Sequence, residues 1–391
     1  MPSAVSQKTV LSVIGLRPLR IGAAEIWFRE LSKQLEQFGW SNVLCFASEP
    51  PPNIAQYLSA PNVTLDVLPD SWSLSWRPTL EFFRLVRRYR PQIVHCHWTG
   101  FVSVYPWLAR LNSVEKFFFT DQLSRPEGYI LRRAPLWKRA AVPIINDPIN
   151  RVQCVSHYGY DCNIALGLLP PNRYAVIYNG VDTSRAAAGL PAAQAFRKKF
   201  AIPEHRSIVT QVSWIIPEKG IQDLIEAASL VLAQNRNVQF VIVGEGPYQA
   251  ECQKRAAELG VSENLTWTGI IQDPLSEGVY AAADVVCQMS RWEEVFGQVI
   301  TEAMASWKPV IGTRVGGIPE LIKDGETGFV VERGDVRAMA EKIVYLLDNP
   351  EERRRMGNGG RQAVEEKFDH VKNVGKVLGL YGLRGVETLS T

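Results

Sequence analysis

Short apolar runs alternate with longer segments of helical spacing along the chain. The run TVLSVIGL near the start is followed by EIWFRELSKQLEQFGW, in which apolar residues recur every three or four positions, and then by SNVLCFAS. Short apolar runs are typical of buried strands, and the longer spacing is typical of amphipathic helices. A strand, helix and strand in this order predict a parallel sheet with helices on its faces.

The same alternation resumes in the second half with SIVTQVSWI, GIQDLIEAASLVLAQ and VQFVIVGEG. A chain of 391 residues is also too long for one ordinary core, so we expect two α/β domains. The Ala-, Gly- and Pro-rich stretch 185–193 lies between them and shows little periodicity, which makes it the predicted interdomain linker.

Composition narrows the class of protein. Apolar residues make up 46% of the chain and charged residues 21%, enough to bury two cores. No uninterrupted run of about 18 apolar residues occurs, so we expect no transmembrane helix. The first residues lack the charge and apolar length of a secretion signal. Six scattered cysteines without a C-x2-C pair favour reduced thiols and a cytoplasmic location.

Charge is divided unevenly. Residues 1–183 carry 19 Lys and Arg against 13 Asp and Glu, a net +6, whereas the rest of the chain carries −3. This bias favours an anionic partner or membrane surface for the first half but is too small for a nucleic-acid partner. The basic and aromatic segment Tyr129–Ile145 could lie peripherally on an anionic bilayer. It could equally form a solvated helix with one buried face.

The stretch Arg291–Glu320 contains the candidate chemistry. Glu294 and Glu302 lie eight positions apart, Gly297 stands between them, and Val299–Ser306 has helical spacing. We therefore predict a helix N-terminus with a carboxylate on each side. Free N–H groups and about half a positive charge at such a terminus suit a phosphate, and the carboxylates suit hydroxyl groups. A nucleotide sugar carries both kinds of group.

A wider pattern around these glutamates resembles a known family. EVFGQVITEAMA (294–305), followed by KPVIG and GGIPE, resembles the E-x7-E signature of retaining family 4 glycosyltransferases. The resemblance implies the α/β GT-B architecture, two doubly wound Rossmann-like domains facing across a cleft. It places the acceptor in residues 1–183 and the nucleotide sugar in 195–365. A C-terminal helix at about 366–385 would pack back on the first domain.

The resemblance also implies roles for residues of the second domain. Glu302 would hold the ribose hydroxyls and Glu294 the hydroxyls of the donor sugar. VSWIIPEKG (212–220) aligns with the family pattern V-G-R-x-x-x-x-K-G, so Lys219 would contact the donor diphosphate. The remaining donor-binding candidates surround the helix N-terminus: Phe296, Gly297, Gln298 and Val299.

Two departures from the family pattern concern charge. Trp214 stands where an arginine normally contacts the diphosphate, and losing one charge-assisted hydrogen bond costs about 1.5 to 3 kcal/mol. Arg291 or Arg314 could offset the loss, or Trp214 could stack on the base or sugar. Gln122 stands at a catalytic position where several members have His beside the donor sugar. An amide can form hydrogen bonds there but cannot carry the proton.

Three further positions are candidates on weaker patterns. Gly22 and Ala23, in RIGAAE, resemble the family's G-G-x-E loop near the reaction centre. Gly244 lies in a glycine-rich strand exit that could contact the nucleotide. His97 ends the predicted strand QIVHCHW, where it could face a ligand or be structural.

We therefore expect a retaining hexosyltransferase that uses a nucleoside-diphosphate sugar, such as a UDP- or GDP-sugar. Its acceptor would be a glycan, lipid or small molecule in cell-envelope or polysaccharide biosynthesis. No Asp-x-Asp pair occurs, so we expect no metal and no cofactor. Two alternatives remain open: a non-catalytic relative that binds nucleotide sugars, and an epimerase or phosphorylase of the same architecture.

Overall fold

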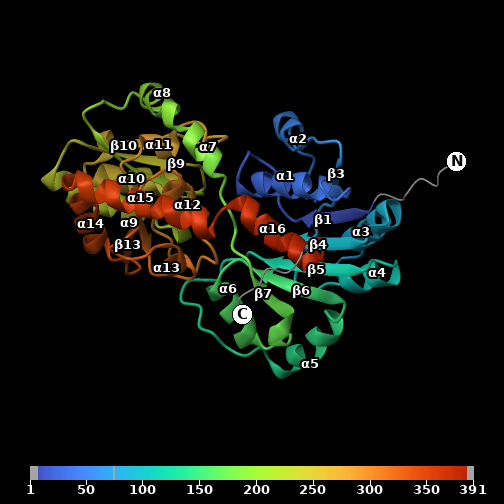
Figure 1. Ribbon diagram of the computed structural model, residues 1–391. Coiled ribbons are helices and arrows are strands. Elements are labelled where there is room, and N and C mark those ends of the chain that lie inside the picture. Colours follow the sequence, from blue (N-terminus) through green and yellow to red (C-terminus); the bar gives the residue numbers. More distant parts are fainter. Residues whose placement is uncertain (1–7, 74, 385–391) are drawn as a thin grey trace. The chain divides into compact units, whose positions relative to one another are not determined.

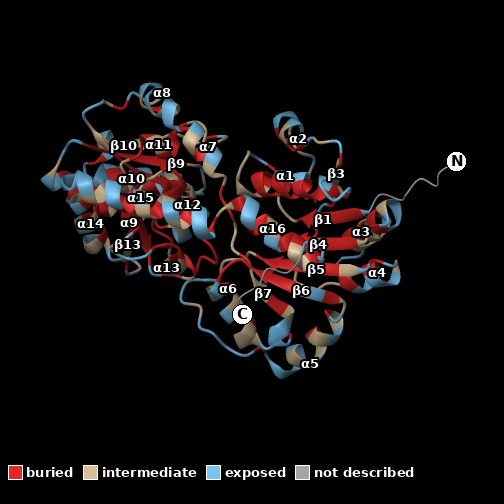
Figure 2. Cartoon of the chain, viewed as in Figure 1, coloured by how far each residue is buried: buried red, intermediate tan, exposed pale blue. Residues whose placement is uncertain are grey.

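A computed structural model describes residues 8–73 and 75–384, which form two compact α/β units (Figure 1). The first unit contains the described residues up to Leu123, together with Ile130–Tyr178 and the chain from His370 onward. The second contains Ser124–Tyr129 and Asn179–Asp369. In both units the strands are almost entirely buried and the helices expose one face (Figure 2). The predicted α/β fold of two Rossmann-like domains is confirmed.

The first unit is built on a parallel sheet with the order β3-β2-β1-β4-β5-β6-β7. The order reverses at β1, which pairs with both β2 and β4. In such open sheets ligands bind beyond the carboxyl ends of the strands, near the reversal. The strands are β1 (Thr9–Ile14), β2 (Ser41–Phe46), β3 (Val63–Val67), β4 (Ile93–His97), β5 (Lys116–Asp121), β6 (Ile149–Cys154) and β7 (Tyr174–Val176).

Helices cover both faces of this sheet. They are α1 (Ala23–Glu36), α2 (Pro52–Leu58), α3 (Trp76–Tyr89), α4 (Tyr105–Leu111), α5 (Leu136–Ile145), α6 (His157–Leu166) and α16 (His370–Tyr381), with the short η1 (Pro171–Arg173). The C-terminal helix α16 adds Val374, Leu378 and Tyr381 to the core that α1 forms with the sheet. The Tyr381 hydroxyl lies 2.7 Å from Nδ1 of His95 on β4, so this helix is an integral part of the first unit.

The second unit repeats the plan with the parallel order β10-β9-β8-β11-β12-β13. Its strands are β8 (Ser207–Val212), β9 (Val238–Val243), β10 (Leu265–Trp267), β11 (Val285–Gln288), β12 (Val310–Thr313) and β13 (Gly328–Val331). Its α-helices are α7 (Thr183–Ala188), α8 (Ala193–Lys199), α9 (Ile221–Gln234), α10 (Gln249–Glu258), α11 (Val279–Ala282), α12 (Gln298–Ala305), α13 (Ile318–Leu321), α14 (Val336–Asp348) and α15 (Pro350–Lys367). Short 3-10 turns are η2 (Leu190–Ala192), η3 (Pro217–Lys219) and η4 (Ser262–Asn264).

The linker predicted at 185–193 is wrong, because this stretch is helical and belongs to the second unit. Asp182 caps α7 by accepting hydrogen bonds from the backbone N–H groups of Ser184 and Arg185. The Arg185 guanidinium forms an ion pair with Asp273. Alanine is the strongest helix former, so the composition that suggested a linker instead favours a helix once a cap begins it. The chain leaves the first unit before this stretch, at Tyr178–Asn179, and returns to it at Asp369–His370.

The segment Tyr129–Ile145 forms a shorter helix than a continuous amphipathic pattern would give. Only Leu136–Ile145 is helical, and Pro135 is the residue before it. A proline disfavours the helical conformation of the residue before it, which ends any helix from the N-terminal side. No helix in the described parts of the chain is both long enough and apolar enough to cross a bilayer.

Candidate active site

The loop that contains Glu294, which we call the signature loop, follows β11 and spans residues 289–297. It packs against the GGIPE turn (316–320), which follows β12 and begins with two glycines. A Cβ on Gly316 would lie 2.0 Å from the carbonyl oxygen of Glu294, and Gly316 has a φ of +52°. The neighbouring Gly317 N–H donates to the same carbonyl at 2.7 Å. The GGIPE turn therefore packs directly on the backbone of Glu294 and fixes the position of that residue.

Glu294 is a buried carboxylate surrounded by donors. Glu294 is only 5% exposed, and its carboxylate forms an ion pair with Lys219. The Ser290 hydroxyl donates to Oε1 at 2.6 Å and the Gln288 amide at 3.3 Å, while the Ser124 hydroxyl donates to Oε2 at 3.1 Å. Burial raises the pKa of Glu294, but the Lys219 charge and the hydrogen bonds from Lys219 and Ser290 more than offset this effect, so the pKa falls below its usual value. The carboxylate is ionised at neutral pH.

Lys219 is held at the end of η3 by its backbone. Gly220 follows it with a φ of +64°, and a Cβ there would lie 1.8 Å from the Met289 carbonyl oxygen. The Gln211 side-chain amide donates to the Lys219 carbonyl at 2.7 Å. The Lys219 ammonium, besides its pairing with Glu294, lies 4.7 Å from the centroid of the Trp292 ring. The lysine thus lies between a carboxylate and an indole.

Helix α12 carries the second glutamate and runs from Gln298 to Ala305, one residue earlier at each end than the predicted Val299–Ser306. The hydroxyl of the buried Tyr280 donates a hydrogen bond to the Glu302 carboxylate, and this bond orients the carboxylate. Gly297 is the residue before the helix, but a Cβ there would lie 2.7 Å from Ile300 Cδ1, so internal packing already explains this glycine. The N–H groups of the first helical residues, Gln298 and Val299, have no acceptor within a helix, as at any helix start.

Two candidates at the signature loop make contacts within the protein. Phe296 is 8% exposed, and its ring meets that of Phe368 edge-on at 6.0 Å. The Gln298 side-chain amide donates to the Gly180 carbonyl at 3.2 Å. Both side chains therefore help to fix the loop, whatever they contact when a ligand is bound.

The arginines that could replace the missing phosphate contact are both paired with carboxylates. The Arg291 guanidinium donates two hydrogen bonds to the Asp223 carboxylate, at 2.9 and 2.5 Å. The Arg314 guanidinium donates one to Glu332 at 2.6 Å. Trp214 follows β8 and is 60% exposed. Its indole is free of the core and accessible to a planar ligand.

Backbone packing after β9 explains why a glycine stands at position 244. This glycine has a φ of +133°, and a Cβ on it would lie 2.0 Å from the Ser213 carbonyl oxygen. Its N–H donates to the Gly269 carbonyl at 3.0 Å. The exits of β8 and β9 thus pack backbone against backbone.

The remaining candidates, Gly22, Ala23 and Gln122, belong to the first unit. Gly22 precedes α1, and its N–H donates to the Glu25 carboxylate at 3.0 Å, which is one of the two hydrogen bonds of a capping box. Ala23 is the first residue of that helix. Gln122 follows β5, and its side-chain oxygen is buried without a hydrogen-bond partner among the described residues. Lys219 and Glu294 are therefore in contact within the second unit, whereas Gly22, Ala23 and Gln122 belong to the first unit.

His97 at the end of β4 is buried in the first unit. It is 1% exposed, and neither ring nitrogen has a hydrogen-bond partner within the described residues. Its ring centroid lies 4.0 Å from that of His95 and 5.0 Å from that of Phe28. Burial lowers the pKa of His97 to about 3, so the imidazole is neutral at physiological pH. It packs as a core residue.

This buried histidine predicts an acid-dependent loss of stability. Below the ordinary pKa of about 6.5 the unfolded chain binds a proton that folded His97 does not, so stability falls as pH falls, by up to about 1.4 kcal/mol per pH unit. We expect His97→Leu to reduce the drop in the urea midpoint between pH 7 and pH 5, with exposed His157→Leu as the control. An equal drop in both variants and the parent would contradict this assignment.

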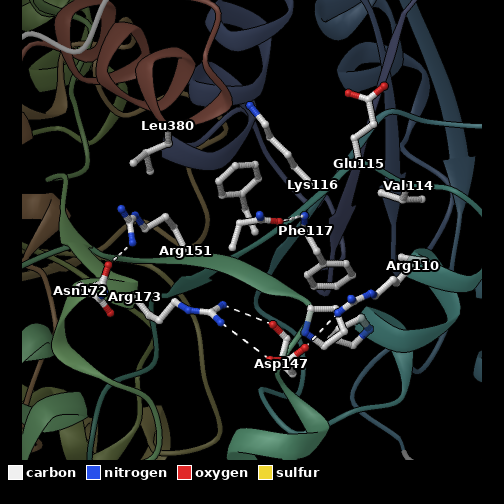
Figure 3. A pocket seen from close by; sticks show the side chains of 15 residues that line it. Arg110, Val114, Glu115, Lys116, Phe117, Asp147, Arg151, Asn172, Arg173 and Leu380 are labelled. Carbon is white, nitrogen blue, oxygen red and sulfur yellow. Dashed lines mark hydrogen bonds and ion pairs between the residues drawn. The ribbon is translucent and has the colours of Figure 1, made fainter.

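A polar cavity of about 740 Å³ opens at the other edge of the first sheet (Figure 3). It lies at the starts of β5 and β6, and its cations are engaged by protein groups. Arg110 binds Asp147 at 2.9 Å, Lys116 donates to the Tyr381 carbonyl at 2.7 Å, and Arg151 binds the Asn172 carbonyl. Ligands of open α/β sheets bind at the carboxyl edge, so this cavity is not the candidate site.

Several site residues carry no sequence signal of their own. Ser124 follows a strand of the first unit, yet the segment Ser124–Tyr129 belongs to the second unit. There Arg125 and Glu293 form an antiparallel bridge with hydrogen bonds of 2.9 and 3.0 Å. Tyr280 and Asp223 lie in segments that read as ordinary helix. Only the fold shows that these residues support Glu294, Glu302 and Arg291.

The second unit thus places buried Glu294, its partly exposed partner Lys219 and a second, oriented carboxylate around one helix N-terminus on a Rossmann-like fold. The family described as Glycosyl transferases group 1 matches residues 193–363, and Glycosyltransferase Family 4 matches residues 24–185. Together these two matches cover most of the chain. The protein belongs to the group 1, family 4 glycosyltransferases, as the sequence pattern predicted.

Curated relatives agree with this family. The chain is 32% identical to N-acetyl-alpha-D-glucosaminyl L-malate synthase of Bacillus anthracis over 55% of each chain. It is 27% identical to alpha-D-kanosaminyltransferase of Streptomyces kanamyceticus over 73% of this chain and 75% of that protein. It is 34% identical to D-inositol 3-phosphate glycosyltransferase of Corynebacterium glutamicum over 61% and 57%. The chain therefore spans little more than half the length of some of these relatives.

Solved structures support the GT-B fold. A glycosyltransferase from Rickettsia africae ESF-5 superposes with a TM-score of 0.79 and 22% identity, over 96% of this chain and 98% of that one. Anabaena Alr3699/HepE in complex with UDP gives a TM-score of 0.76 and 19% identity, over 96% and 100%. At these identities the likeness concerns the fold.

Proposed function

We propose that the protein transfers a sugar, with retention of configuration, from a nucleoside-diphosphate sugar to an acceptor. The observation that carries this proposal is the ion pair between buried, ionised Glu294 and Lys219 beside the N-terminus of α12. This arrangement offers one group for sugar hydroxyls and one for phosphate, side by side. Family membership and the Anabaena structures solved with UDP and UDP-glucose support the same ligand class.

The reaction we propose needs little proton chemistry from side chains. The bond from the anomeric carbon to the diphosphate breaks, and the acceptor oxygen bonds to that carbon on the same face. The acceptor proton passes to an oxygen of the leaving phosphate, so Gln122 does not have to carry it. Lys219 and the first N–H groups of α12 stabilise the negative charge that develops on the diphosphate. Glu294 orients the donor sugar.

The nucleoside would be held by Glu302. The Tyr280 hydroxyl fixes this carboxylate, leaving it half-exposed to accept hydrogen bonds from ribose hydroxyls. We assign Trp214 a stacking role on the base or sugar in place of the family arginine. Arg291 would have to break its ion pair with Asp223 to bind the phosphate. We therefore propose that Trp214 contributes more than Arg291 to donor binding.

The acceptor we propose is a glycan, a lipid-linked group or a small molecule. Names among the relatives include an N-acetyl-alpha-D-glucosaminyl L-malate synthase, D-inositol 3-phosphate glycosyltransferases and GDP-mannose-dependent phosphatidylinositol monomannoside mannosyltransferases. These names support a small-molecule or lipid-linked acceptor. We propose that the product belongs to cell-envelope or polysaccharide biosynthesis and that the reaction takes place on the cytoplasmic side. We further propose that the reaction needs no metal, since the chain has no Asp-x-Asp pair.

A second candidate function is nucleotide-sugar binding without transfer. It is favoured by Trp214 and Gln122, which both replace charged or titratable residues of the family pattern. Because binding and transfer are separate measurements, one experiment distinguishes the two functions.

A thermal-shift panel of UDP, GDP, ADP and their glucose and mannose derivatives tests the proposal. One nucleoside series at about 100 times its dissociation constant is expected to stabilise the protein by about 2.7 kcal/mol, a shift of roughly 5 to 10 °C. The same ligand should then release sugar or form product, with or without EDTA. Lys323→Met, which changes an exposed lysine of the second unit, is the control and should keep the shift.

Other outcomes of the panel have definite meanings. A shift without donor hydrolysis or transfer supports the non-catalytic function. Activity that EDTA removes and Mn²⁺ restores contradicts metal independence. If no nucleoside diphosphate shifts the melting temperature, the proposed site is wrong.

A further inference from the structure

Large apolar side chains are exposed on one part of the first unit. Nearly half of the exposed large apolar residues in the described chain fall between positions 102 and 144, on and around α4 and α5 (Figures 1 and 2). We call this surface the α4–α5 face; its apolar members are Val102, Val104, Trp107, Leu111, Ile130, Leu131, Leu136, Trp137 and Ile144. A gathering of this kind marks an interaction surface more often than chance exposure does.

Helix α5 exposes its apolar residues and buries almost none. Val142 is its one buried residue, packed against Ala134 and Leu168. Leu136, Trp137 and Ile144 are 79%, 67% and 68% exposed. A helix on a water-facing surface normally buries such residues and exposes polar ones. The sequence of α5 is therefore suited to an apolar environment outside the protein.

The apolar residues of α4 join those of α5. The Trp107 indole N–H donates to the Ile144 carbonyl at 3.0 Å, which fixes the two helices side by side. Leu111, one turn further along α4, is 76% exposed. The face is consequently one surface on two helices held by a defined contact.

The charge of this face is positive. The 17 residues Tyr129–Ile145 contain Arg132, Arg133, Lys138 and Arg139 and no Asp or Glu. On neighbouring α4, Arg110 engages the nearby carboxylate of Asp147 at 2.9 Å (Figure 3). The cations of Tyr129–Ile145 thus have no acidic residue within their own segment.

Indole rings and cations lie together on the face. The Lys138 ammonium lies 5.3 Å from the centroid of the Trp137 ring, and the Arg110 guanidinium 5.6 Å from that of Trp107. Tryptophan prefers the level of lipid headgroups, and Lys and Arg reach lipid phosphates from there. Both groups are therefore placed as a bilayer surface requires.

We propose that the α4–α5 face docks the protein on the surface of an anionic lipid bilayer. The apolar residues would enter the headgroup boundary and the cations would meet lipid phosphates. A second copy of the chain is a poorer occupant, because a self-complementary contact would bring the cations of Tyr129–Ile145 from both copies together. The proposal adds a location to the proposed glycosyl transfer, but lipid binding does not depend on that activity.

Vesicle co-sedimentation of the full chain tests the proposal. We expect binding to phosphatidylcholine vesicles containing about 30% phosphatidylglycerol, weaker binding without it, and a decrease as salt rises. Trp137→Ser with Leu136→Ser should weaken binding at least about tenfold. Arg132→Gln with Arg133→Gln and Lys138→Gln should weaken it about 100-fold, at roughly 1 kcal/mol per charge.

The control is Trp76→Ser, which removes an indole that is 70% exposed on α3 of the same unit but lies outside the face. It should bind vesicles as the parent does, and circular dichroism should show all variants folded. No binding to anionic vesicles, or equal loss in Trp76→Ser, would overturn the proposal. The proposal would also be overturned if the protein self-associates, if the Trp137 variant abolishes this self-association, and if adding vesicles does not change it. Transfer to a water-soluble acceptor, measured separately, shows whether the proposed function fails on its own.

Discussion

The Glu294→Gln variant is expected to keep nucleoside-diphosphate binding while transfer falls at least about 100-fold. The amide has nearly the same shape as the carboxylate, so the contacts with Ser290 and Ser124 can be kept in part. It has no negative charge, however, and cannot accept hydrogen bonds on both atoms from the donor sugar. The loss should therefore appear in turnover far more than in nucleotide affinity.

Calorimetry with the nucleoside diphosphate and single-turnover transfer measure the two effects separately. Glu332→Gln is the matched control, because this glutamate is 67% exposed at its side chain and pairs with Arg314 at the surface. The control should transfer at the parent rate. Undiminished turnover in Glu294→Gln would mean that the carboxylate does not act on the donor.

The Lys219→Met variant should lose both donor affinity and rate. Methionine keeps much of the apolar stem, but the ammonium that we assign to the leaving diphosphate is gone. We expect affinity for the nucleoside diphosphate to fall about 10- to 100-fold and transfer to fall about 100-fold or more. Exposed Lys323→Met should leave both values unchanged.

The same substitution should destabilise the fold, because Glu294 is buried and loses its cation. Breaking a buried pair by removing one partner costs about 3 to 5 kcal/mol. The pKa of Glu294 now lies below its usual value, so its stabilising effect is present above about pH 4.5 and is lost as pH falls. Without Lys219, burial would raise that pKa instead, and the difference between variant and parent should shrink towards acid pH.

A double variant separates the two roles of Lys219. Lys219→Met with Glu294→Gln removes the unpaired charge, so much of the lost stability should return at neutral pH, while transfer should stay as low as in either single variant. Urea or thermal unfolding and the transfer assay measure these outcomes on the same protein. If stability does not return, the pair is not what holds this part of the second unit.

The two predicted parallel sheets followed from periodicity, because strands buried on both faces leave short apolar runs that few other structures produce. The start of α12 was predictable to within one residue for a similar reason, since helical spacing begins at Val299 and the helix begins at Gln298. The helix at α7 was missed because its composition was read without its Asp182 cap. Local rules identify elements well when the interactions that stabilise them are local.

The sequence by itself determined the family and the α/β class, and it singled out Glu294, Glu302 and Lys219 as candidates, because each of these inferences rests on a pattern of residues close together in the chain. Only the tertiary structure showed that Lys219 pairs with Glu294, that Ser124 comes from a segment far earlier in the chain, and that Asp223 engages Arg291. These contacts join residues 68 to 170 positions apart. No local pattern encodes such pairs, because they form only when segments far apart in the chain meet in the folded second unit.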